Sequence, residues 1–190
     1  AEWRGLECPE NYVRSNWGDS RMYNYCVSRE SESDSYARSN YGEFLTTVDG
    51  DAWYEQSRSR VGYVVTTNQS GAGTQTMQTR LHDNYGSRSD GAAGLGHYRA
   101  IYQSEDGSHR AFALVPGAII RGSASPNSTV TATAMVTIPD AEFEYTRQTQ
   151  VAEDGTYQFT LANPGDYTIE TGNETTAVTV NETAVQNGTT

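Results

Sequence analysis

Lysine is absent from this chain of 190 residues: all 13 basic residues are arginine, against 24 aspartates and glutamates and a formal net charge of −11. Arginine is the more weakly hydrated cation and pairs bidentately with carboxylates, whereas a carboxylate-rich surface stays soluble where salt screens its self-repulsion. Ordinary acidity explains the charge but not the missing lysine. The composition therefore predicts a halophilic protein, folded in strong brine.

The shortage of positive charge and of long apolar runs excludes two functional classes. Affinity for nucleic acid depends on neutralising phosphates, so we expect no nucleic-acid partner. No apolar run approaches the roughly 20 residues that span a bilayer, and Ala1 does not open a signal peptide with a charged and then an apolar region. We therefore expect no membrane span, and either a mature secreted product or a soluble piece of a larger protein.

Cysteine is scarce, whereas glycosylation triplets are frequent. Cys8 and Cys26 are the only two cysteines, and in an oxidising exterior we expect a disulfide between them, worth about 3 kcal/mol. Two buried thiols are the alternative. In a chain rich in Asn, Ser and Thr, one or two Asn-X-Ser/Thr triplets arise by chance, but five predict at least one glycosylated site and an extracellular, cell-surface location. The five acceptors are Asn68, Asn127, Asn173, Asn181 and Asn187.

Residues with catalytic or metal-binding spacing are also lacking. His82, His97 and His109 are too scattered for a metal site and are interpreted as isolated structural histidines. Asp49-Gly50-Asp51 resembles a metal-binding carboxylate pair, but this pattern ahead of a helix is more typical of a turn and a helix cap. The sequence contains no serine nucleophile elbow and no glycine-rich phosphate loop between a strand and a helix. We therefore predict no catalytic residue, no metal and no cofactor.

The first 115 residues combine helix and strand patterns and predict a mixed α/β domain. Apolar positions recur at helical spacing from Tyr36 to Leu45, and Asp51 is a cap candidate for a second helix. A β-branched and aromatic run over 61–67 predicts a strand buried on both faces. The other expected elements are a short strand within 11–25, a helix over 74–82, a surface loop over 84–96, and strands over 97–104 and 109–115 joined by an Asp106-Gly107 turn.

Residues 116–190 predict an all-β sandwich without helices. Turn residues such as Pro126, Pro139, Gly155 and Pro164 recur at the short, regular spacing of that architecture. The fold class is therefore α+β, with a mixed α/β domain at 1–115 followed by the sandwich at 116–190. The expected strands cover 118–122, 129–138, 143–150, 157–161, 166–170 and 177–180.

Three segments of the last third carry a resemblance to a known fold family. The run Val115-Pro-Gly-Ala-Ile-Ile-Arg-Gly122 is followed by Asp154-Gly155-Thr-Tyr157 and then by Pro164-Gly165-Asp-Tyr167. This order resembles the carboxypeptidase-regulatory, transthyretin-like β-sandwich family. That fold serves stalks, spacers and binding domains, so the resemblance implies an architecture and no particular activity.

A second resemblance begins at Ser15-Asn16-Trp17-Gly18-Asp19. An indole beside a carboxylate can form a small pocket for a hydroxyl and a methyl group; the alternative is an aromatic side chain packed under a loop. Together with the later segments 63–66, 97–102 and 115–118, it resembles the soluble C-terminal region of haloarchaeal oligosaccharyltransferase catalytic subunits. In that family a Ser-preceded Trp-Trp-Asp-Tyr-Gly motif comes first. Trp17 matches a motif tryptophan, whereas Asn16, Gly18 and Asp19 depart from the pattern.

The second resemblance implies a non-catalytic domain or relative of an archaeal oligosaccharyltransferase that takes part in protein N-glycosylation at the cell surface. Trp17 and Asp19 would contact an extended peptide or a protein partner, with Met77 as the counterpart of the family's second pocket motif. The family's catalytic, metal-binding carboxylates lie in its membrane part, which has no counterpart in this sequence. The alternative function is a secreted structural glycoprotein that self-assembles into a filament, surface layer or adhesive stalk.

Overall fold

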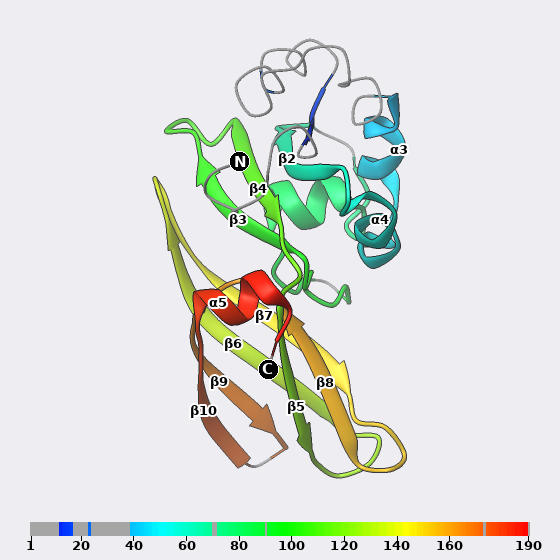
Figure 1. The fold of residues 1–190 in the computed structure, drawn as a ribbon, viewed down its shortest axis with the longest axis vertical. Coiled ribbons are helices and arrows are strands. Elements are labelled where there is room, and N and C mark those ends of the chain that lie inside the picture. Colours follow the sequence, from blue (N-terminus) through cyan, green and yellow to red (C-terminus); the bar gives the residue numbers. More distant parts are fainter. Residues whose placement is uncertain are drawn as a thin grey trace.

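The computed structural model describes residues 12–16, 23, 39–69, 72–89, 91–172 and 174–189. These residues form two parts stacked along the long axis of the molecule (Figure 1), here called the N-terminal half (12–115) and the C-terminal half (116–189). Most of the regular structure is β-strand. Five of the predicted contact, disulfide and glycosylation residues lie outside the described ranges: Cys8, Trp17, Asp19, Cys26 and Asn173.

A four-stranded sheet with the order β1-β2-β4-β3 is the centre of the N-terminal half. β1 runs parallel to β2, whereas β2 and β3 both pair antiparallel with β4. The predicted hairpin at Asp106-Gly107 is confirmed, and Gly107 adopts the positive φ of +69° that this turn requires. The strands are β1 (Tyr12–Arg14), β2 (Val61–Thr67), β3 (Tyr98–Gln103) and β4 (His109–Leu114).

The helical segments among the described residues of this half are short. They are α3 (Tyr41–Thr46), α4 (Gly50–Ser57) and a π-helix, η2 (Thr79–Asp83). The prediction that Asp51 caps the second helix is wrong. Asp49 is the cap, because its carboxylate accepts a 3.0 Å hydrogen bond from the amide of Ala52, which places Asp51 inside the first turn.

Two sheets enclose the core of the C-terminal half. One has the order β10-β9-β6-β7 and the other pairs β5 with β8. Buried and exposed residues alternate along β6, with Val130, Ala132 and Ala134 inward and Thr131 and Thr133 between them, as expected for a strand with one covered face. The strands are β5 (Ala118–Ser123), β6 (Thr129–Ile138), β7 (Ala141–Gln150), β8 (Thr156–Leu161), β9 (Gly165–Thr171) and β10 (Glu174–Val180).

The expectation that residues 116–190 contain no helix is wrong. Helix α5 (Glu182–Asn187) follows β10 directly and lies between the two halves in Figure 1. Asn181 caps it by accepting a 2.8 Å hydrogen bond from the amide of Ala184, and Gly188 ends it with a φ of +66°. Its buried residues Ala184 and Val185 cover the sandwich core.

The segment 84–96 was expected to be a surface loop, but its end is buried between the two halves. Leu95 is 1% exposed, and its carbonyl accepts a 2.5 Å hydrogen bond from the hydroxyl of Tyr145 in β7. Gly94 and Gly96 permit this approach because a Cβ on either residue would collide with the backbone of β7 or β8. Gly94 and Gly96 therefore serve close packing, and one continuous apolar cluster joins the halves.

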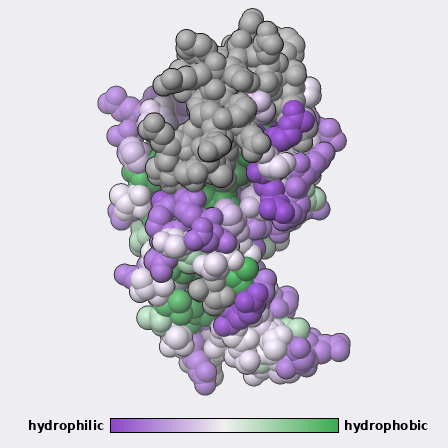
Figure 2. Space-filling model, in the orientation of Figure 1, coloured by the Kyte–Doolittle hydropathy of each residue, from purple (hydrophilic) through white to green (hydrophobic). Residues whose placement is uncertain are grey.

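None of the helices in the described parts of the chain is long and apolar enough to cross a membrane. Figure 2 shows that hydrophilic side chains cover much of the described surface in this view, with hydrophobic patches on the C-terminal half. This surface agrees with the low mean hydropathy of −0.70.

Candidate functional site

The candidate site begins where β1 ends, because Trp17 follows the described residues Ser15 and Asn16 directly in the chain. β1 is an edge strand of the N-terminal sheet, and its pairing with β2 places Arg14 opposite Val64. Ser15 is 1% exposed and Asn16 is half-buried.

Arg14 anchors this end of β1 to both α3 and α4. Its side chain is fully buried, and its guanidinium carbon lies 4.9 Å from the ring centroids of both Phe44 and Trp53. Nη2 also donates a 2.9 Å hydrogen bond to Ser57, one helical turn beyond Trp53. A buried guanidinium is costly to displace, since its ring contacts and hydrogen bonds replace water. The position of Ser15 and Asn16 is therefore set by α3 and α4.

Tyr23 is the first described residue that follows the Trp17–Asp19 segment in the sequence. It packs against the buried apolar cluster that contains Tyr41 of α3. Burial raises the pKa of the Tyr41 hydroxyl, and the neighbouring Tyr23 raises it further. Tyr41 donates a 2.9 Å hydrogen bond to the carbonyl of Val65, which ties α3 to β2. Described positions before and after Trp17 and Asp19, Ser15 and Tyr23, are thus both packed on the N-terminal core.

Met77, the third predicted contact residue, lies in the core. Its side chain is fully buried, and its sulfur lies 2.8 Å from where a Cβ on Gly50 would stand. Its amide donates to the carbonyl of Thr47 at 2.8 Å, just before α4 begins. Met77 and Arg14 therefore hold opposite ends of α4. Contact of Met77 with a peptide stays a prediction.

Sequence reasoning missed the role of Arg14 and of its partners. A charged residue within a short apolar strand, Tyr12-Val13-Arg14, was the only signal. The helix over 50–57 shows Trp53 and Ser57 one turn apart, but nothing in the sequence indicates that this face meets β1.

Two of the three histidines are paired within the fold. His82 is paired with Thr66 at 3.1 Å, and His97 stacks on Tyr54 with a ring separation of 3.9 Å. Burial is the main cause that lowers the pKa of both imidazoles. No group of three or more His, Cys, Asp or Glu side chains gathers among the described residues. These contacts agree with structural roles for both residues.

Four of the five glycosylation acceptors are described, and all four are exposed: Asn68, Asn127, Asn181 and Asn187. Their local settings differ. Asn127 has a φ of +61° in the turn before β6, while Asn181 caps α5 and Asn187 ends it. The cap hydrogen bond of Asn181 uses its Oδ1 atom. Glycosylation would modify the side-chain nitrogen and would leave this bond in place.

Residues 117–190 match the family model of the long peripheral domain of archaeal glycosylation protein B. A comparison with curated proteins finds no significant match. The remaining comparisons concern solved structures and extend over both halves of the chain.

Three solved structures of an oligosaccharyltransferase from Archaeoglobus fulgidus share the fold. The complex with an inhibitory peptide and a dolichol-phosphate has a TM-score of 0.73 at 16% identity, over 96% of this chain and 37% of that chain. The form tethered to an acceptor peptide with an NVT sequon has a TM-score of 0.73 at 17% identity, over 96% of this chain and 38% of that chain. The complex with Zn and sulfate has a TM-score of 0.71 at 16% identity, over 97% of this chain and 41% of that chain.

The chain thus spans less than half of the solved proteins that it resembles. At these identities the likeness concerns the fold, and it covers the sheet with its helices as well as the sandwich. We conclude that this chain has the fold of part of an archaeal oligosaccharyltransferase, with residues 117–190 matching the long peripheral domain of archaeal glycosylation protein B.

Proposed function

We propose that this chain is a non-catalytic domain, or a non-catalytic relative, of an archaeal oligosaccharyltransferase, and that it serves protein N-glycosylation by binding peptide. The observation that carries the proposal is the shared fold over 96% of the chain, joined to the family match at 117–190. Fold alone does not establish function, so the proposal depends on the site at the end of β1.

The peptide-binding role rests on the order of residues at that site. Trp17 offers an apolar wall and Asp19 an acceptor, three and five residues after the buried Arg14. A binding segment gains affinity when its supporting residues are rigid, because less ordering is needed on binding. The contacts of Arg14 with Phe44, Trp53 and Ser57 supply that support.

The direct test is binding of an extended peptide that carries Asn-Val-Thr, measured by fluorescence anisotropy in molar salt. The matched control peptide carries Asn-Val-Ala, which lacks the hydroxyl that the pocket is proposed to recognise. We expect the first peptide to bind more tightly. Equal affinity for the two peptides would contradict the proposed recognition.

Variants separate a binding role from a packing role. Trp17→Ala should weaken peptide binding by about 2 kcal/mol or more, as for a buried aromatic anchor, while the melting temperature is kept. If Trp17 is a core residue, the same change should lower stability by about 3–5 kcal/mol. Tyr102→Ala is the control, since Tyr102 is a 45% exposed aromatic residue on β3.

A secreted structural glycoprotein is the second candidate, because the four described acceptors Asn68, Asn127, Asn181 and Asn187 are all exposed. Such a protein would self-assemble at the cell surface in a filament, surface layer or stalk. The full genomic reading frame discriminates the two: many upstream membrane spans support the transferase domain, whereas a lone signal peptide supports the structural protein.

Several finer features belong to the same proposal. We place the chain at the extracellular face of a halophilic archaeon, with domains at 1–115 and 116–190. A Cys8–Cys26 disulfide would stabilise the first domain. Two reactive thiols in denatured, unreduced protein would contradict the predicted disulfide. An intact mass equal to that of the bare polypeptide would contradict the predicted glycosylation of the sequon asparagines.

A further inference from the structure

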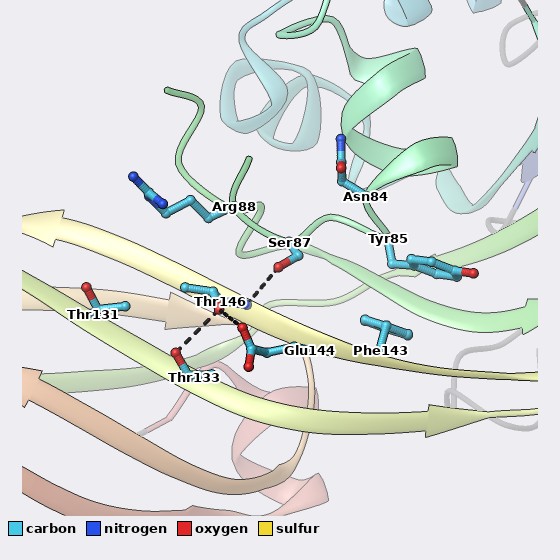
Figure 3. A pocket seen from close by; sticks show the side chains of 9 residues that line it. All are labelled: Asn84, Tyr85, Ser87, Arg88, Thr131, Thr133, Phe143, Glu144 and Thr146. Carbon is cyan, nitrogen blue, oxygen red and sulfur yellow. Dashed lines mark hydrogen bonds between the residues drawn. The ribbon is translucent and has the colours of Figure 1, made fainter. Parts of the chain in front are cut away.

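A polar groove of about 490 Å³ runs between the two halves, on the outward face of β6 and β7. Thr131, Thr133, Glu144 and Thr146 project from the strands, and Ser87 faces them from the loop after η2 (Figure 3). This volume lies within the roughly 300–1,000 Å³ range of small-molecule sites. The groove is distant in sequence from the segment around Trp17.

The side chains of the groove are held in place by one another. Ser87 accepts a 2.9 Å hydrogen bond from the amide of Thr146, whose hydroxyl lies 3.3 Å from that of Thr133 and 3.5 Å from a Glu144 oxygen. Arg88 is fixed by a 3.1 Å bond from its Nε to Gln148. A ligand would therefore meet side chains that are already oriented, which lowers the entropic cost of binding.

The lining excludes most ligand classes. One arginine, Arg88, and one glutamate, Glu144, leave no net charge for a phosphate or a nucleotide, and a lone carboxylate cannot hold a divalent cation. Among the described residues, the aromatic rings that line the groove are Tyr85 and Phe143, which stack on each other with ring centroids 4.3 Å apart, while the guanidinium of Arg110 lies 4.0 Å from the ring of Tyr85. Both faces of Tyr85 and one face of Phe143 are therefore covered, and Phe143 is 9% exposed, which leaves little ring surface for an apolar ligand.

A peptide strand cannot extend the sheet at this point. β7 is an edge strand, but at Thr146 the amide donates to Ser87 and the carbonyl accepts from the amide of Arg88 at 2.8 Å. Both backbone groups that a new strand would need are occupied. Strand addition, the usual way in which an edge binds peptide, is blocked here.

We propose that this groove binds a neutral saccharide. Sugar hydroxyls both donate and accept hydrogen bonds, and so do the four hydroxyls of Ser87, Thr131, Thr133 and Thr146. The second carboxylate oxygen of Glu144 accepts from a further sugar hydroxyl, and the guanidinium of Arg88 donates. Recognition of a neutral ligand is also weakly affected by screening in strong salt. The site is independent of the peptide-binding function, so either can fail alone.

The test is titration of ¹⁵N-labelled protein with the neutral trisaccharides mannotriose and maltotriose in molar salt. NMR chemical shifts of the backbone amides report binding. We expect one trisaccharide to shift the amides of Ser87, Thr133 and Thr146 with a millimolar or lower Kd. No shift at tens of millimolar of either sugar would overturn the site. Tighter binding of trigalacturonate, or shifts of these amides by the sugar-free Asn-Val-Thr peptide, would overturn the ligand class.

Two variants on one strand provide the internal control. Glu144→Ala should weaken trisaccharide binding about tenfold, the effect of losing a hydrogen bond to a charged group. Glu142→Ala removes the same charge two residues away, outside the groove, and should leave the Kd unchanged. Equal losses in both variants would contradict the groove. A glycopeptide that bears the same trisaccharide is titrated in parallel. Tighter binding of the glycopeptide would identify the ligand as a protein-linked glycan. Equal or weaker binding would show that the glycan is recognised without its carrier.

Discussion

Arg99 in β3 and Glu182 in α5 form an ion pair between the two halves: Nη1 of Arg99 donates a 2.6 Å hydrogen bond to Oε1 of Glu182. Burial of the Glu182 carboxyl acts to raise its pKa, but hydrogen bonds from Arg99 and Gln186 outweigh burial and lower the pKa below its ordinary value of 4.5. The ion pair fastens the last helix to the first sheet.

We expect Arg99→Met to lower the free energy of unfolding by about 1 kcal/mol or less, because the Glu182 side chain is 51% exposed and the pair is screened. The folded pKa of Glu182 is depressed, so its contribution is present above pH 4.5 and is lost as the pH falls through the folded pKa. Chemical unfolding of both proteins at pH 7 and pH 3 measures this. A difference that grows on acidification would contradict the assignment.

Gly96 tests the close packing of the loop against the sandwich. A Cβ at this position would lie 2.6 Å from the carbonyl oxygen and 2.9 Å from the Cβ of Thr160. Gly96→Ala should therefore destabilise the protein by about 1–3 kcal/mol through overpacking. Gly42→Ala is the control, since no atom of the described residues lies within 4 Å of its Cβ position in α3 and alanine favours helix by about 0.5–1 kcal/mol. Thermal unfolding should shift the two midpoints in opposite directions.

His97 predicts a loss of stability in mild acid. Its Nδ1 lies 3.2 Å from the carbonyl of Val115, so this nitrogen donates, and burial lowers the pKa of the ring below its ordinary value of 6.5. Since the unfolded chain takes up the proton first, stability is full above pH 6.5 and falls as the pH drops toward the folded pKa. His97→Asn keeps a donor but cannot titrate. It should flatten the pH dependence of the melting temperature, whereas an unchanged slope would assign the effect to other groups.

Salt dependence follows from the net charge of −11 and the missing lysine. We expect the folded state to need molar salt, because dilute buffer restores the repulsion among carboxylates. Calorimetry before and after dialysis into dilute buffer measures this. An unchanged transition midpoint would show that the composition is not an adaptation of stability to brine.

The strands were predictable from the sequence because their patterns are local. β2 (Val61–Thr67) and β6 (Thr129–Ile138) have the predicted bounds, and the Asp106-Gly107 turn joins the expected hairpin. β-Branched runs and Asp-Gly turns act through neighbouring residues, so a single sequence contains the information. The resemblance to the transferase region likewise came from the order of short segments, and the shared fold agrees with it.

Only the tertiary structure determined what each residue meets across the halves. The sequence of 84–96 is rich in glycine, which is equally typical of an exposed loop and of a backbone that packs closely. The hydrogen bond from Tyr145 and the short distances at Gly94 and Gly96 show that the end of this segment is closely packed. The capping residue Asn181 precedes a helix too short for a periodic pattern to reveal. Arg14 stands in a three-residue strand, and its buried position depends on rings contributed by two later helices. Local pattern determined the elements of this protein, whereas the candidate site and the groove arose from contacts between distant segments, which a single sequence does not encode locally.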